Sequence, residues 1–129
     1  MKTTARVLSV GQCYADGPAL ERAVAEHFQA QVDHAATAAE AQAALANGLP
    51  ALVLVNRIFD ADGGSGLDFI RALRSDPRLK TVPIMLVSNY ADWQSQAVAL
   101  GAVPGFGKDA LGQPAMFEVL RPHLPALRI

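Results

Sequence analysis

Three polar side chains stand at the ends of apolar stretches, where they could act together. Asn56 ends the stretch ALVLVN, Ser88 follows VPIMLV, and Lys108 follows VPGFG. An amide, a hydroxyl and an ammonium group without a carboxylate, with Arg57 adjacent, would form a donor-rich pocket for an anion or a small polar ligand. We favour the alternative, in which Lys108 bonds Asn56 and Ser88 and fixes one conformation that serves as a docking surface.

Other groups near these stretches have simpler interpretations. Asp16 lies a few residues beyond the first apolar stretch, and Asp60 and Asp62 lie in the loop that follows Asn56. Carboxylates are common before helices and in turns, so we expect Asp16 to cap a helix and the other two to solvate a turn. The one cysteine, Cys13, excludes an internal disulfide and is expected to be a partly buried side chain without a redox role. The histidines lack metal-ligand spacing, and no nucleophile–base pair indicates an enzyme.

Length and composition predict one globular domain, 1–129, that binds neither nucleic acid nor membranes. The chain has 129 residues, of which 51% are apolar and 18% charged, with a formal net charge of −1. A net charge of −1 gives no indication of the excess of basic residues with which proteins bind nucleic acids and anionic lipids. Its apolar stretches are far shorter than the ~18–20 residues that cross a bilayer. No signal peptide is evident at residues 1–4, so we expect a cytoplasmic protein.

Five apolar stretches predict five strands, and the segments between them have helical periodicity. The strands are expected at residues 5–10, 31–36, 51–56, 82–87 and 103–107. Strict alternation of strands and helices gives a parallel sheet covered by helices on both faces. The first, third and fourth strands are the most apolar, so they belong at the centre. The fold class is therefore α/β, a flavodoxin-like doubly wound sheet of order 2-1-3-4-5 with five helices.

Cap signals and periodicity place the helices. Thr37 and Glu40 form a capping box at the start of the second helix, and Asp92 is expected to cap the fourth. Apolar residues that recur at helical spacing predict the buried helix faces. These faces comprise Leu20, Val24, His27 and Phe28 in the first helix, Leu67, Phe69, Ile70 and Leu73 in the third, Trp93, Ala97 and Leu100 in the fourth, and Met116, Phe117 and Leu120 in the last.

The chain resembles the receiver domains of response regulators, the CheY-like superfamily, over essentially its whole length. The resemblance is carried by ALVLVN, GLDFI, VPIMLVS and GAVPGFGK. It implies an aspartate at the end of the third strand that accepts a phosphoryl group from a histidine kinase, and two acidic residues after the first strand that help bind Mg²⁺. It further implies that Ser88 and Lys108 stand where a hydroxyl and a lysine contact the phosphoryl oxygens. An aromatic residue three positions before the lysine changes rotamer on activation in that family.

Several positions depart from the family's pattern. The acceptor position is Asn56, and Gly11 and Gln12 replace the acidic pair. Gly105 replaces the aromatic residue, Asp109 follows the lysine where proline is usual, and the loop after the third strand is longer. A neutral carboxamide is a poor nucleophile, and Mg²⁺ prefers anionic oxygen ligands. The loss of all three carboxylates predicts that phosphorylation and Mg²⁺ binding are lost, which leaves no cofactor.

We therefore interpret the chain as a degenerate receiver, or pseudo-receiver, without an output domain. It is expected to act by contact with a protein of a two-component signalling pathway or with a second copy of itself. The partner surface is expected around Tyr90, Trp93 and Phe106, although Trp93 fits core packing equally well. Two alternatives stay open: a phosphorelay regulator that uses Asp60 or Asp62 as its acceptor, and a sensor built on the anion or ligand pocket described above.

Overall fold

Strands and helices alternate along the chain, as the sequence predicts. The computed structural model describes residues 4–127, and the expectation about a signal peptide falls largely outside them. The strands are β1 Ala5–Val10, β2 Ala30–Ala35, β3 Leu52–Asn56, β4 Ile84–Val87 and β5 Val103–Phe106. The helices are α1 Asp16–His27, α2 Ala38–Ala46, α3 Gly66–Arg74, α4 Ala91–Ala99 and α5 Pro114–Leu120. Short 3-10 turns, Pro77–Leu79 and Lys108–Ala110, precede β4 and follow β5.

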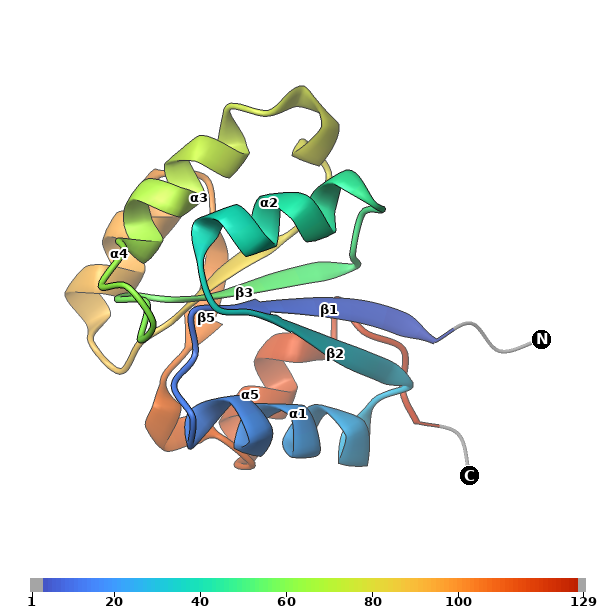
Figure 1. Cartoon of the computed structure of the whole chain (residues 1–129). Helices are drawn as coiled ribbons and strands as arrows, with labels where there is room; N and C mark the ends of the chain where they lie inside the picture. Colours follow the sequence, from blue (N-terminus) through green and yellow to red (C-terminus); the bar gives the residue numbers. More distant parts are fainter. Residues whose placement is uncertain (1–3, 128–129) are drawn as a thin grey trace.

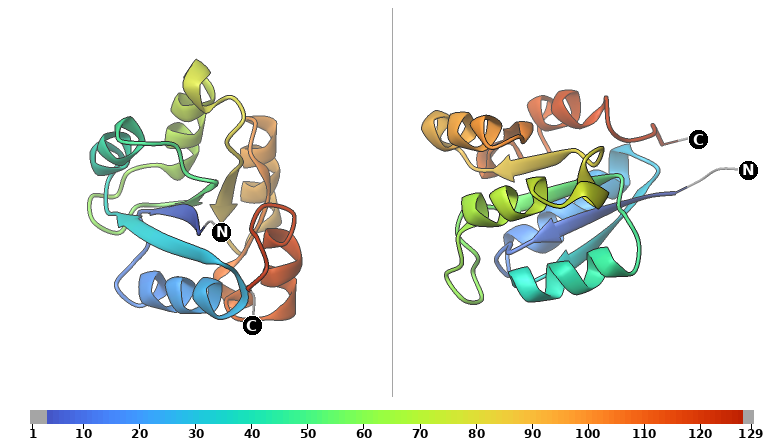
Figure 2. Two further views of the ribbon diagram at one scale, coloured as in Figure 1. Left: turned by 90° about the vertical axis from the view of Figure 1, so that its right-hand side faces the viewer. Right: turned by 90° about the horizontal axis from the view of Figure 1, so that it is seen from above.

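The strands form one parallel sheet of order β2-β1-β3-β4-β5, and helices cover both of its faces (Figure 1). α1 and α5 pack on one face, whereas α2, α3 and α4 pack on the other, and Figure 2 shows these layers from two further sides. Every residue of β3 is buried because helices cover this central strand on both sides. The flavodoxin-like fold class and the strand order are therefore confirmed.

The helix starts agree with the predicted caps in one place and differ in another. Thr37 Oγ1 accepts the backbone N–H of Glu40 at 3.2 Å, as predicted, but Glu40 Oε1 accepts the N–H of Ala36 at 3.4 Å and not that of Thr37, so only one half of the predicted capping box is confirmed. α4 begins directly after Tyr90, and no side chain caps it. The prediction that Asp92 caps this helix is wrong, because Asp92 already lies in the first helical turn.

Two hydrophobic cores, one on each face of the sheet, contain most of the predicted helix faces. In α1, Leu20 and Val24 are buried, as is Phe28 directly after the helix, but His27 is exposed. The ring of His27 stacks on that of Phe117 in α5, with 3.6 Å between the centroids. The prediction of a buried His27 is therefore wrong: this last-turn position meets the neighbouring helix at the surface.

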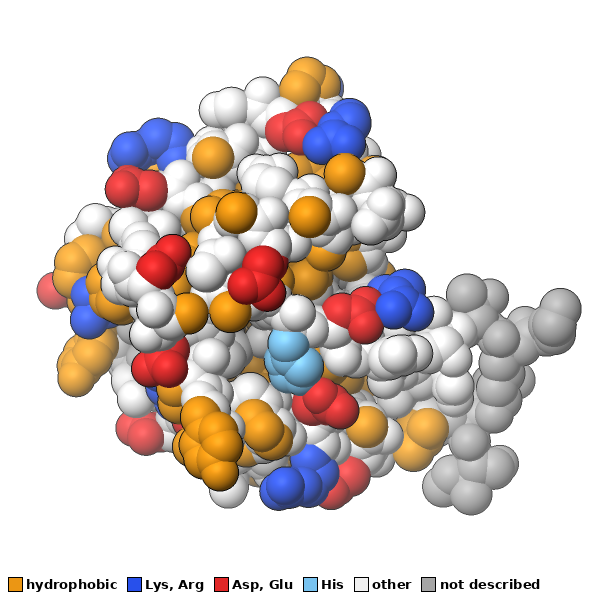
Figure 3. Space-filling model, in the orientation of Figure 1, with side chains coloured by type: hydrophobic (Ala, Val, Ile, Leu, Met, Phe, Trp, Pro, Cys, Tyr) orange, Lys and Arg blue, Asp and Glu red, His pale blue; other side chains and the backbone are white. Residues whose placement is uncertain are grey.

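The molecular surface carries side chains of both charges and hydrophobic side chains. Acidic, basic and hydrophobic side chains are interspersed on the face shown in Figure 3, in agreement with the net charge of −1. Between residues 4 and 127, no helix combines the length and the apolar character needed to cross a membrane.

Candidate functional site

Asn56 lies at the carboxyl end of β3 and is only 5% exposed. Its Nδ2 donates two hydrogen bonds of 2.9 Å, to the carbonyl oxygens of Gly11 and Ile58. Its Oδ1 accepts the backbone N–H of Arg57 at 3.0 Å. Both amide N–H groups are thus engaged by backbone of the loops that follow β1 and β3. Asn56 bridges these loops and has no donor left for a ligand.

Phe59 fills the space beside Gly11. Gly11 has a φ of +76°, and a Cβ at this position would overlap the ring of Phe59. That ring is buried and packs edge-on against Phe69, with 5.9 Å between the centroids. The loop after β3 holds it there by folding back on itself, since the N–H of Phe59 donates to the carbonyl of Gly64 at 2.8 Å. An apolar ring therefore stands beside the position at which the family pattern has an acidic residue.

The two carboxylates of this loop are exposed. Asp62 Oδ1 accepts the N–H of Gly64 at 2.9 Å and so stabilises the turn, as predicted. The backbone N–H of Asp60 donates to the carbonyl of Gly11 at 3.1 Å, which leaves its side chain in solvent. Neither carboxylate forms an ion pair with Lys108.

Lys108 pairs with Asp16 and does not form the predicted bonds to Asn56 and Ser88. Its Nζ lies 3.0 Å from Oδ2 of Asp16, across the loops that follow β1 and β5. Asp16 is the first residue of α1 and makes no cap hydrogen bond, so the prediction that it caps the helix is also wrong. Burial raises the pKa of Asp16, but a hydrogen bond from Cys13 and the charge of Lys108 outweigh burial, so the net shift of this pKa is downward.

Ser88 and Gln94 organise the ends of β4 and β5. The buried Oγ of Ser88 accepts the N–H of Tyr90 at 3.3 Å. Gln94 Nε2 donates to the carbonyl oxygens of Leu86 and Ser88 at 2.8 and 3.1 Å, and its Oε1 accepts the N–H of Gly105 at 3.1 Å. A Cβ at Gly105 would overlap the Leu86 carbonyl oxygen. Gln94 therefore ties α4 to both strands, and position 105 has no room for an aromatic switch.

Arg57 lies over the ring of Trp93, with its Cζ 4.7 Å from the ring centroid. Trp93 is partly buried and packs against the core on the α2–α4 face, so core packing accounts for it. Phe106 is 5% exposed and belongs to the other core, so the prediction that it lies on a partner surface is wrong. Tyr90, by contrast, is 64% exposed and available for contact.

In the structure, the four side chains predicted to form an anion pocket contact other groups of the protein rather than one another. Each of its four groups already has a partner: the two loops for Asn56, the Tyr90 amide for Ser88, Asp16 for Lys108 and Trp93 for Arg57. Ser88 accepts in its contact and Arg57 stacks on a ring, so the O–H of Ser88 and the guanidinium N–H groups of Arg57 are not used up, and an anion pocket at this edge stays a prediction.

These residues also do not fit the Mg²⁺ ion that the resemblance implies. Mg²⁺ needs a near-octahedral set of hard oxygen ligands. Here the acceptor position presents the N–H donors of Asn56, and Gly11 faces the apolar ring of Phe59. In the part of the chain that the structure describes, no three His, Cys, Asp or Glu side chains are grouped to hold a metal.

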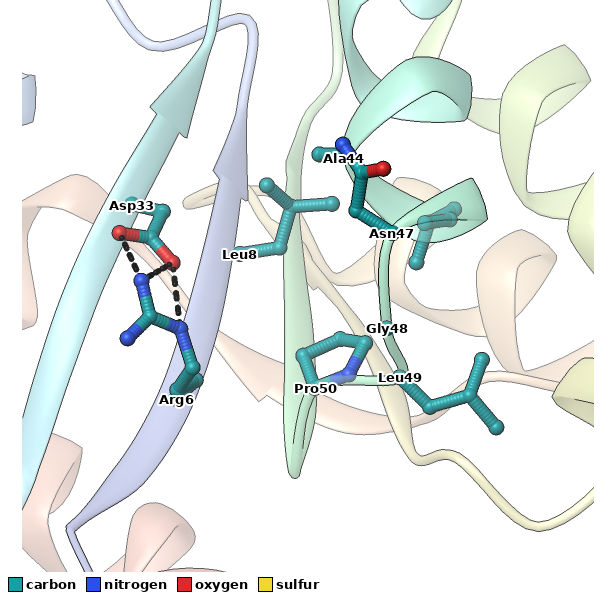
Figure 4. A pocket seen from close by; sticks show the side chains of 9 residues that line it. Arg6, Leu8, Asp33, Ala44, Asn47, Gly48, Leu49 and Pro50 are labelled. Atoms are coloured by element: carbon teal, nitrogen blue, oxygen red, sulfur yellow. Dashed lines mark hydrogen bonds and ion pairs between the residues drawn. The ribbon is translucent and has the colours of Figure 1, made fainter.

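A hollow of about 310 Å³ lies away from this edge, beside the amino-terminal end of β3 (Figure 4). Its charged residues, Arg6 and Asp33, form a bidentate pair across β1 and β2 with bonds of 2.7 to 3.0 Å. Much of the remaining wall is apolar and includes Leu8, Leu49 and Pro50. Both charges are satisfied by one another, so neither is free to orient a ligand.

The roles of Phe59 and Gln94 and the pairing of Asp16 with Lys108 were not predicted from the sequence. Phe59 had a usable signal, since a large apolar residue in a loop of Asp and Gly residues is often turned inward. Gln94 had none, because a glutamine in a helix is ordinarily a solvated residue. The Asp16 pair depends on the course of two loops, which periodicity does not specify.

No protein-family model matches this chain, and no curated protein matches it either. Solved structures do resemble it. The response regulator NtrX from Brucella abortus superimposes with a TM-score of 0.79 and 18% identity, over 95% of this chain and 27% of NtrX. The chemotaxis response regulator CheY4 of Vibrio cholerae gives 0.73 and 20%, over 95% of this chain and 100% of CheY4. A putative response regulator from Chloroflexus aurantiacus superimposes with a TM-score of 0.72 and 19% identity, over 92% of this chain and 99% of that protein.

The chain thus spans about a quarter of NtrX and the full length of CheY4. At such identities the likeness establishes the fold, which is CheY-like.

Proposed function

We propose that this chain is a receiver-like domain of a two-component signalling pathway that acts by binding another protein, without phosphorylation. The observation that supports this most is the hydrogen bonding of Asn56, whose amide joins the loops after β1 and β3. Phosphoryl transfer to a receiver needs a carboxylate nucleophile and a metal that neutralises the phosphoryl oxygens. A carboxamide engaged by backbone, beside an apolar ring, supplies neither.

The carboxyl-terminal edge of the sheet carries the features of a contact surface. Tyr14, Ile58 and Tyr90 lie in the loops after β1, β3 and β4 and are 93%, 45% and 64% exposed. Exposed aromatic and aliphatic side chains on one edge favour protein contact. We propose that this edge, defined by these three residues, is the partner surface.

Charge indicates what kind of partner fits this edge. Its loops and first helical turns also carry exposed carboxylates, namely Asp60, Asp62, Asp92 and Asp109. The basic residues there, Arg57 and Lys108, are engaged by Trp93 and Asp16. Complementarity therefore favours a partner segment with basic and apolar side chains. A second copy of this edge, or a nucleic acid, would bring like charges together.

Two measurements test the proposal. The first is an amide NMR titration with Mg²⁺ and then beryllofluoride, an acyl-phosphate mimic; we expect no saturable change at Asn56, Ser88 or Lys108. A saturable Mg²⁺-dependent change would overturn the proposal and direct attention to Asp60 or Asp62 as the acceptor.

The second measurement compares capture of proteins from cell extract by the wild type and by the Tyr14→Ser/Tyr90→Ser variant. Leu49→Ser is the matched control, because Leu49 is 51% exposed but lies before β3, away from the edge. A partner that binds the control but not the double variant supports the proposal that this edge is the partner surface. Equal retention by all three proteins would exclude it.

A further inference from the structure

A second hollow, of about 370 Å³, lies between the carboxyl ends of β1 and β2 and the first turns of α1. It is on the α1 side of the sheet and shares none of its lining with Asn56, Ser88 or Lys108. The residues that line it are Ser9, Gln12, Cys13, Tyr14, Gly17, Pro18, Glu21, His34, Ala35 and Ala36. Its volume falls in the range of small-molecule sites, about 300–1,000 Å³.

Two of the lining residues, Ser9 and Gln12, carry polar side-chain atoms that are buried and have no hydrogen-bond partner. Ser9 is 1% exposed and its Oγ has no hydrogen-bond partner. Both the Oε1 and the Nε2 of Gln12 are also buried without a partner. Native proteins rarely leave such groups unpaired, because a buried donor or acceptor without a partner loses the hydrogen bond that it would make with water. One water occupies about 30 Å³ in the liquid, so the hollow has room for a molecule considerably larger than the water that would satisfy a single group.

The unpaired groups define the chemistry that would complement them. Gln12 offers one donor and one acceptor on a planar amide, and Ser9 offers a hydroxyl that can do either. A carboxamide of this kind pairs bidentately with a planar edge that carries an N–H beside a lone pair, as adenine does. The charged residue at the hollow, Glu21, is engaged by His34, whose Nε2 lies 2.6 Å from Glu21 Oε1. Because Glu21 and His34 already bind one another, neither is free to pair with a charged ligand, and the site favours a neutral one.

We propose that this hollow binds a small neutral molecule through a planar edge that bears an adjacent N–H donor and acceptor, of the nucleobase or primary-amide kind. Ser9 and Gln12 bind that edge. Pro18 and the aromatic ring of Tyr14, which also line the hollow, supply the apolar contacts that a planar group buries. The inference does not depend on whether Asn56 is phosphorylated, since neither Asn56, Ser88 nor Lys108 lines the hollow, although Tyr14 belongs both to the hollow and to the proposed partner surface.

Gly17 provides a way to fill the hollow without unfolding the protein. A Cβ at this position would meet the ring of His34 at 3.7 Å and the Cβ of Gln12 at 3.9 Å, which are ordinary contacts between two lining residues. Gly17 lies within α1, where alanine stabilises a helix relative to glycine. Gly17→Ala should therefore narrow the hollow while the melting temperature stays the same or rises.

The test is an amide NMR titration of the intact chain with adenosine and, separately, with nicotinamide. We expect saturable shifts at Ser9, Gln12 and Gly17 with a Kd on the order of 1 mM or tighter in at least one arm. Gln12→Met should weaken binding by about tenfold or more, because it removes a donor and an acceptor. Gln31→Met, the same change at an exposed position of β2, should leave it unchanged.

The two arms identify the source of the edge. Saturation by adenosine alone indicates a nucleobase, saturation by nicotinamide alone a primary amide, and saturation by both the shared edge. Absence of saturation in both arms would overturn the proposal and leave water as the occupant. Binding that persists unchanged in both Gln12→Met and Gly17→Ala would also overturn it, because the ligand would then lie elsewhere.

Discussion

Replacing Asn56 by aspartate should destabilise this protein strongly, although aspartate is the residue that the receiver pattern has at this position. In the wild type, Nδ2 of Asn56 donates to two carbonyl oxygens at 2.9 Å. An aspartate would place a carboxylate oxygen against these same two acceptors. The substitution therefore removes two donors and adds a buried negative charge whose one hydrogen-bond donor is the backbone N–H of Arg57.

The magnitude follows from these contacts. Leaving a buried acceptor without its donor costs about 1–3 kcal/mol, and an unpaired buried charge costs about 3–5 kcal/mol. Because the 5% exposure of this site admits little solvent, we expect Asn56→Asp to lose about 3–5 kcal/mol of unfolding free energy at pH 7. Against a typical total of about 5–15 kcal/mol, such a loss would leave the variant marginally folded.

The penalty should depend on pH with a definite sign. Facing two carbonyl oxygens, the new carboxyl group has a pKa in the folded protein that is raised above its value in the unfolded chain. A protonated carboxyl can donate to one carbonyl, so the variant is least impaired near pH 4 and loses stability as the pH rises toward 7. Asn56→Leu is the control, because it removes the same donors without adding a charge and so carries a penalty that does not change with pH.

Urea denaturation followed by the fluorescence of Trp93, the single tryptophan, measures both variants between pH 4 and 7.5. An Asn56→Asp variant within about 0.5 kcal/mol of the wild type at pH 7 would refute the reasoning. It would mean that the loops after β1 and β3 do not depend on the amide, and that this site can hold a carboxylate after all.

Three further changes test other contacts of the site. Gly11→Ala should cost about 2–4 kcal/mol of unfolding free energy, since it strains a positive φ and its Cβ overlaps the ring of Phe59. In a double-mutant cycle, adding Phe59→Leu should restore the part of this stability that is lost to the overlap. Asp16→Asn should cost under about 1 kcal/mol of unfolding free energy at neutral pH. Because the pKa of Asp16 is lowered on folding, the wild type loses this advantage as the pH falls, and a stability difference that does not change with pH would contradict the ion pair. Gln94→Glu should cost about 2 kcal/mol and speed hydrogen exchange at Gly105, whereas unchanged exchange would show that Gln94 does not hold β5.

The strands and their order in the sheet could be predicted from the sequence, because both follow from which stretches of the chain are apolar enough to be buried. The stretch 51–56 is apolar without alternation, as a strand covered on both faces must be, and the structure has β3 at Leu52–Asn56. Helix faces were less certain, since periodicity does not say where the last turn leaves the core. His27 has the right spacing for burial, yet it stacks on Phe117 at the surface.

The position of the candidate site could be predicted from the sequence, but the contacts between its side chains could not. Asn56, Ser88 and Lys108 end neighbouring strands or follow them, and topology alone brings them to one edge. Their partners were beyond prediction, because each comes from a loop or from another element. The ammonium of Lys108 reaches Asp16 in place of Asn56, and this outcome depends on loop geometry that no hydrophobic pattern encodes.

The departures from the receiver pattern near Asn56 support one another physically. The amide at position 56 needs carbonyl acceptors, and one of them is presented by Gly11, whose positive φ favours glycine. The missing side chain at Gly11 in turn makes room for Phe59, whose loop returns to that same carbonyl through the N–H of Asp60. Restoring an acidic residue at position 11 would displace the ring, and restoring it at position 56 would repel the carbonyl. The site is therefore a consistent packing arrangement, and no single reversion returns it to phosphoryl chemistry.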